Sequence, residues 1–146
     1  MLLALLPMLA PAAAAPVEAE NVWIREVPPV SPAAALFVTL THAGSQPLRV
    51  LSMSSPFAER VEWHDMTMAG GVMRMQRRRH IVLPAQAGVS LAPGGSHLML
   101  QGLKQPLRVG MTVPVTLVFE RGRPLTIQAI VRRSLPAAGK TEHHHH

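Results

Sequence analysis

The chain has 146 residues, a formal net charge of +6, no cysteine and only 3% aromatic residues. A blue-copper electron carrier is excluded, because that site needs a cysteine thiolate. The basic charge does not indicate nucleic-acid binding, since lysine is nearly absent and no aromatic residues interleave with the basic ones. Without an N-terminal leader, about 125 residues would remain, enough for one domain but not for two.

Residues 1–15 are apolar and uncharged. This run is shorter than the roughly twenty residues that span a membrane, and it is typical of the apolar part of a secretory leader. We therefore expect residues 1–19 to be a cleaved leader, cut before Glu20, or a retained weak membrane anchor. No basic residue precedes the run, which keeps the anchor and a start further upstream open.

Ten short segments, each bounded by turn residues, have the composition of strands. In chain order they are 22–27, 34–41, 48–53, 61–66, 72–76, 80–83, 89–91, 97–101, 113–120 and 125–131. No segment has a convincing helical period. The pattern predicts one all-β domain over residues 20–135, with seven to nine strands in two packed sheets joined by Greek-key connections, as a sandwich or barrel.

Three of these segments contain residues with soft, uncharged metal ligands: His64, Met75, His97 and Met99. Thioether sulfur favours Cu(I), whereas Zn, Mg and Ca prefer harder donors. Side chains alternate along a strand, so His97 and Met99 share one face while Leu98 points to the other. Three neighbouring strands would thus bring these ligands to one patch, and we expect them to bind one Cu(I) per chain.

The spacing of the four residues resembles the H-x10-M-x21-H-x-M pattern of the periplasmic PCuAC copper chaperone family. The resemblance extends over residues 21–133 and includes Glu62, the segments 71–73 and 93–95, and the last long strand at 115–120. It implies a cupredoxin-like fold and a role as an extracytoplasmic chaperone that delivers Cu(I) to the copper centre of a cytochrome c oxidase. His42 departs from the family, which often has Asn there, and we expect that position to cap a turn.

Several residues near these ligands are candidates for supporting roles. Glu62 shares the face of His64 and could accept its second ring proton. Met66, Met68 and Met73 are expected to form an apolar rim around the copper. His42 and His80 are expected at the surface rather than as ligands. Because imidazole must be deprotonated to bind metal, Cu(I) affinity should fall below about pH 6.

Two further segments have alternative interpretations. The run Arg77, Arg78 and Arg79 is expected at a solvated hairpin tip, where it could steer docking onto an acidic partner. Residues 136–146 are expected to be a disordered tail whose four terminal histidines are an expression tag. If they are native, they would form a secondary Cu(II) site.

Catalysis is not indicated, because adjacent residues on a strand point apart and no nucleophile elbow precedes either His64 or His97. We expect a periplasmic or otherwise extracytoplasmic monomer, bound to a membrane only if the anchor is retained. Its partner would be the oxidase copper-centre subunit or another copper chaperone. The alternative function is copper storage or tolerance without a dedicated acceptor, because both functions need the same ligands.

Overall fold

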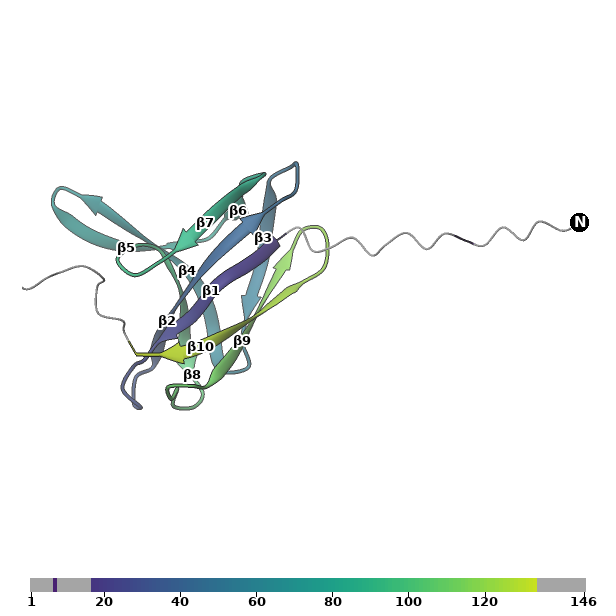
Figure 1. Cartoon of the computed structure of the whole chain (residues 1–146). Coiled ribbons are helices and arrows are strands. Elements are labelled where there is room, and N and C mark those ends of the chain that lie inside the picture. Colours follow the sequence, from purple (N-terminus) through teal and green to yellow (C-terminus); the bar gives the residue numbers. More distant parts are fainter. Residues whose placement is uncertain (1–6, 8–16, 134–146) are drawn as a thin grey trace, which may run out of the picture.

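Ten strands form the domain in the computed structural model, which describes Pro7 and residues 17–133 (Figure 1). They are β1 (Val17–Arg25), β2 (Ala33–His42), β3 (Leu48–Ser54), β4 (Ala58–Ala69), β5 (Val72–Arg78), β6 (Ile81–Leu83), β7 (Ala87–Leu91), β8 (His97–Leu103), β9 (Thr112–Phe119) and β10 (Leu125–Arg132). The all-β prediction is confirmed. Within the described part of the chain, no helix is long and apolar enough to cross a membrane.

The strands belong to one continuous sheet in the order β5-β4-β8-β2-β1-β10-β9-β3-β6, with β7 also paired to β2. Residues 17–133 thus form ten strands where seven to nine were expected, and hydrogen bonds join the two sides of the sandwich into one sheet. Strand β2 explains the difference, because its first half pairs with β8 through residues 33–36 and its second half pairs with β7 through residues 38–42. Strand β2 thus belongs to both sides of the fold. The alternation of apolar and polar residues along the sequence cannot indicate such a change of partner.

One cluster of buried hydrophobic side chains, contributed by nearly all the strands, forms the core. Strand β9 shows the pattern most plainly, since Val113, Val115, Leu117 and Phe119 are buried while the residues between them are not. Removal of a large apolar side chain from water contributes about 1.5–3 kcal/mol. Leu98 on β8 and Trp63 on β4, which are 0% and 1% exposed, anchor the two strands that carry the predicted histidines.

The first strand begins earlier than predicted. Strand β1 starts at Val17, which is 1% exposed and pairs with His42. Residues 17–19, assigned above to the leader, therefore belong to the sheet. The rest of the expected leader, at 1–6 and 8–16, and the tail at 134–146 lie outside the described residues, as do the four terminal histidines.

Strands β4 and β5 form a long hairpin that extends away from the rest of the sheet (Figure 1). Its two-residue turn is Gly70-Gly71, with φ angles of 59° and 78°, the positive values that a tight turn matched to the strand twist requires. Arg77 and Arg78 lie within β5 and only Arg79 lies in the bend that follows, so the prediction that the run forms a hairpin tip is wrong, although all three are exposed as expected.

Candidate metal centre

The strand register places the four predicted ligands on one face of the sheet. His64 on β4 lies directly opposite His97 on β8, and Met99 on β8 lies opposite Glu62. On the other side of β4, Met75 of β5 lies opposite Met66. Because residues that face each other across a ladder point to the same side, these side chains form one cluster.

Both ring nitrogens of His64 have a partner. Nε2 lies 2.9 Å from Oε2 of Glu62, and Nδ1 lies 3.1 Å from the sulfur of Met75. An ionised carboxylate only accepts hydrogen bonds, so Nε2 donates the proton and Nδ1 keeps its lone pair. The hydrogen bond from His64 is the main reason that the pKa of Glu62 is lowered, and Arg77 and Arg60 add to this effect. The lone pair on Nδ1 of His64 therefore faces the sulfur of Met75.

In His97 the free ring nitrogen is Nε2, whereas in His64 it is Nδ1. Its Nδ1 lies 3.3 Å from the backbone oxygen of Gly95, which can only accept, so this nitrogen carries the proton. Its Nε2 is buried without a hydrogen-bond partner. An unpartnered buried nitrogen is costly in the absence of a ligand. The ring centres of His97 and His64 are 5.7 Å apart, so the two free nitrogens belong to one small region.

A cavity of about 270 Å³ lies at this cluster. Its lining includes Met75, His97, Met99 and Met66, together with Arg25, Ala35, Phe37, Gly94 and Gly95. Ala35 lies opposite Met99 on β2, and its small side chain leaves space beside the thioether. Met68 and Met73 are not part of this lining, so of the three methionines expected at the rim only Met66 reaches the cavity.

Burial and neighbouring positive charge favour the neutral form of the His97 ring. Burial is the main reason that the pKa of His97 is lowered, and the neighbouring charges of His64 and Arg25 act in the same direction, while the Gly95 hydrogen bond opposes them. Arg25 stacks over Phe37, with its guanidinium carbon 5.2 Å from the ring centre. A neutral imidazole is the form that binds metal.

Asp65, which the sequence analysis did not assign, connects the elements that carry the ligands. It accepts hydrogen bonds from Arg78 Nε at 2.7 Å, Ser96 Oγ at 2.8 Å and Trp63 Nε1 at 3.0 Å. Burial raises the pKa of Asp65, but these three hydrogen bonds outweigh that effect and the net shift is downward. Arg78 is on the strand of Met75, and Ser96 directly precedes His97. Asp65 thus connects β4 to β5 and to the segment that leads into β8, the two strands on either side of β4.

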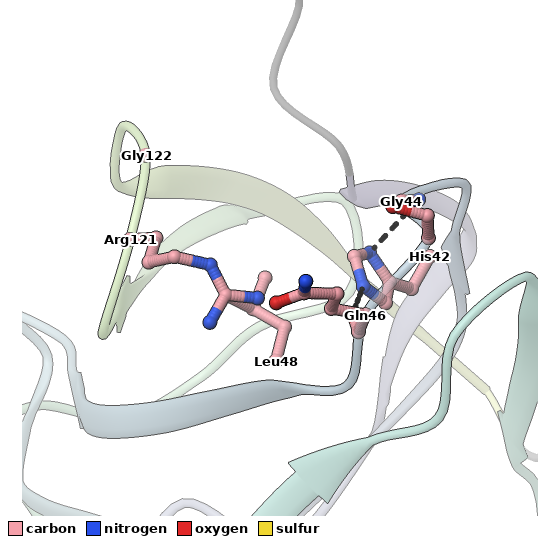
Figure 2. A pocket seen from close by; sticks show the side chains of 7 residues that line it. His42, Gly44, Gln46, Leu48, Arg121 and Gly122 are labelled. Atoms are coloured by element: carbon pink, nitrogen blue, oxygen red, sulfur yellow. Dashed lines mark hydrogen bonds between the residues drawn. The ribbon is translucent and has the colours of Figure 1, made fainter.

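His42 lies in a different cavity, of about 290 Å³, with Gly44, Gln46, Leu48 and Arg121 (Figure 2). It is 3% exposed, so the prediction of a surface histidine is wrong, whereas His80 is exposed. The His42 ring donates from Nε2 to the Gln46 carbonyl at 2.6 Å and accepts at Nδ1 from the Gly44 amide at 3.4 Å. His42 therefore caps the turn after β2, as expected, and has no free nitrogen for a metal.

The chemistry of the donor set fits a soft ion. Within residues 17–133, no three His, Cys, Asp or Glu side chains converge as a metal-binding group. The soft ligands that the strand register brings to this cluster are the thioethers of Met75 and Met99 beside the two imidazoles. Such a set favours Cu(I) over Zn, Mg or Ca.

The family model described as "Putative lipoprotein LpqE-like" matches residues 17–131. A curated relative named "Putative lipoprotein Lxx21020", from Leifsonia xyli subsp. xyli, is 34% identical over 107 residues, which are 73% of this chain and 63% of that protein. The matched region therefore spans less than two thirds of this relative.

Solved structures with the same fold include a copper-bound PCuAC domain from PmoF2, which is 29% identical with a TM-score of 0.69; the match covers 84% of this chain and 97% of that domain. The solution structure of CuI-DR1885 from Deinococcus radiodurans is 34% identical with a TM-score of 0.67, and the match covers 85% and 83% of the two chains.

The fold and these comparisons define a cupredoxin-like domain of the PCuAC type, which confirms the fold and the resemblance predicted from the sequence. The chain belongs to the LpqE-like family.

Proposed function

We propose that this protein is an extracytoplasmic Cu(I) carrier whose ligands are His64, Met75, His97 and Met99. The observation that supports this most strongly is the pair of opposed histidines, each with one nitrogen held by an acceptor and the other directed to a thioether or left without a partner. The copper-bound PCuAC structures among the relatives support the choice of metal.

Each residue has a distinct part in this proposal. His64 supplies Nδ1 and His97 supplies Nε2, while Met75 and Met99 supply sulfur. Glu62 holds the tautomer of His64, and the Gly95 carbonyl holds that of His97. None of the four ligands carries charge, so loading one Cu(I) releases no thiol proton and leaves no thiolate to oxidise.

The position of the site suits transfer rather than catalysis. Met75 is 50% exposed on an edge strand, whereas His64 and His97 are 8% and 7% exposed. An acceptor can therefore displace Met75 first and the histidines later, so that copper passes by ligand exchange without being set free. We propose a monomeric carrier rather than an enzyme.

The proposed acceptor is the copper centre of a cytochrome c oxidase, reached directly or through another copper chaperone. This step extends the resemblance to the PCuAC family. An extracytoplasmic location is supported by the lipoprotein names of the family and of the curated relative. The same proposal includes an N-terminal leader that is either cleaved or retained as a weak membrane anchor.

The alternative function is storage or tolerance, in which the same site buffers copper and has no dedicated acceptor. A transfer assay separates the two. The Cu(I)-loaded protein is mixed with an apo oxidase copper-centre fragment, and metal on both proteins is measured over time. Delivery predicts transfer faster than dissociation of Cu(I) to a small chelator, whereas storage predicts transfer no faster than that dissociation.

The binding site itself is tested by titrating reduced protein with Cu(I) in competition with a chromophoric Cu(I) chelator. All proteins carry alanine at 143–146, so that the terminal histidines do not contribute. We expect one tight site in the parent protein, weakened by His97→Ala and by Met99→Ala and abolished when all four ligands are replaced. Met53→Leu, on β3, is the matched control. Tight binding that survives the fourfold substitution would refute the assignment.

A further inference from the structure

The methionines of the β4–β5 hairpin continue outward beyond the cavity. After the opposed pair Met66 and Met75, the next pair on the same face is Met68 and Met73. We call these four residues the methionine ladder. Met68 is 69% exposed and Met73 is 49% exposed, so the outer pair is open to solvent while Met66 lines the cavity.

The exposure of these side chains is concentrated at this hairpin. Among the described residues, the exposed large hydrophobic side chains include Met68, Val72, Met73 and Met75 here and only scattered residues elsewhere. The opposite face of the hairpin is polar, with Thr67 opposite Arg74. A simple apolar rim would be served equally by Leu or Val, but the ladder has a thioether at each of its four positions.

We propose that Met66, Met68 and Met73 bind a second Cu(I), separate from the ion held by the histidines. Thioether sulfur is a soft, neutral ligand that selects Cu(I). Because no imidazole takes part, this outer site should be weaker than the inner one.

The outer site gives the carrier a point of entry and exit for its copper. Met66 connects the inner and outer sites, because it lines the cavity and lies two residues before Met68 on the same face of β4. An ion held by Met68 and Met73 could move inward along the ladder to Met75 and His64. This role rests on the proposed carrier function, but the binding of a second ion does not depend on it.

The test uses the full chain with alanine at 143–146, labelled at its methionine methyl groups and titrated with Cu(I) under anaerobic, reducing conditions. Methyl NMR signals are followed through two equivalents of metal. We expect the first equivalent to shift Met75 and Met99, and the second to shift Met68 and Met73. Met68→Leu with Met73→Leu should reduce the capacity from two ions to one and leave the first binding event unchanged, whereas Met53→Leu should leave both.

The outcomes separate this proposal from the proposed function. If the second equivalent shifts neither Met68 nor Met73, or if the double leucine variant still binds two ions, the outer site is refuted while the inner site stands. In a His64→Ala, His97→Ala variant, shifts confined to Met66, Met68 and Met73 would support the outer site by itself. Protein that binds no Cu(I) at all would refute both.

Discussion

Glu62 Oε2 lies 2.9 Å from Nε2 of His64, two residues further along the same strand and on the same face. This contact decides which nitrogen of His64 is free, because a carboxylate accepts the Nε2 proton and leaves the Nδ1 lone pair beside Met75. Glu62 is itself held by Arg60 and Arg77, at 3.6 and 3.7 Å. The proposed ligand geometry at His64 therefore depends on Glu62, which need not touch the metal itself.

Replacement of Glu62 should weaken Cu(I) binding without loss of the fold. A partner that orients a metal-bound histidine is typically worth about 10-fold to 100-fold in affinity, and we expect a loss in that range for Glu62→Ala. Chelator competition measures it. Glu59→Ala removes an exposed carboxylate from the same strand and should bind normally. Equal affinity of the Glu62 and Glu59 variants would contradict the role of Glu62.

Asp65→Ala should destabilise the protein and disturb the site. The substitution leaves Trp63 Nε1 and Ser96 Oγ without their acceptor, and a lost hydrogen bond to a charged or buried group costs about 1–3 kcal/mol. Denaturant unfolding of the apo protein measures this loss. Glu26→Ala breaks only an exposed pair with Arg133 at 4.0 Å and should change stability by less than about 0.5 kcal/mol. Similar losses in both variants would argue against Asp65 as a connecting residue.

Stability of the apo protein should fall with acidification in two windows. The pKa of His97 is lowered in the fold from its ordinary value of 6.5, so the unfolded chain takes up a proton first and stability begins to decrease as pH falls through that value. The pKa values of Glu62 and Asp65 are also lowered, from 4.5 and 3.8. Their contribution is lost at lower pH, as the folded carboxylates become protonated.

NMR titration of the His97 ring tests the first window directly. We expect its midpoint below 6.5 in the parent protein and a midpoint closer to that value in Arg25→Gln, because a neighbouring positive charge is removed. A midpoint at or above the ordinary value in the parent would contradict the neutral, buried state assigned to His97.

The turn of the β4–β5 hairpin should matter for the position of Met75. Gly70 and Gly71 have φ angles of 59° and 78°, and a side chain there costs about 1–2 kcal/mol per residue. Replacement of both by alanine should therefore loosen the hairpin and weaken Cu(I) binding, whereas Gly70→Asn should be tolerated because Asn accepts this conformation. Amide exchange in residues 66–75 reports the loosening. Unchanged exchange in the double alanine variant would count against this argument.

The sequence contained enough information for the fold class and for the faces of the strands. Alternation placed His97 and Met99 together, and the spacing of the four ligands led to the PCuAC resemblance. The start of β1 at Val17 was not predicted, because residues 17–19 were counted with the apolar leader although Pro16 directly precedes them. Likewise, no local pattern shows that β2 pairs with β8 along one half and with β7 along the other.

The site could be predicted less completely, because register across strands is not a local property. The sequence shows that His64 and His97 are candidates but not that they lie directly opposite each other. Asp65 was missed for the same reason, since its partners Arg78 and Ser96 come from two other parts of the chain. One signal was present: Asp65 shares the inner face of β4 with Trp63, where an acidic residue needs partners.

X-ray absorption at the copper K-edge of protein loaded with one equivalent of Cu(I) tests the central claim most directly. Alanine at 143–146 again removes the terminal histidines. The account predicts an edge typical of Cu(I) and a first shell of two imidazole nitrogens and two sulfurs, with one nitrogen lost in His97→Ala and one sulfur lost in Met99→Ala. A first shell without sulfur, or one that is the same in both variants, would contradict it.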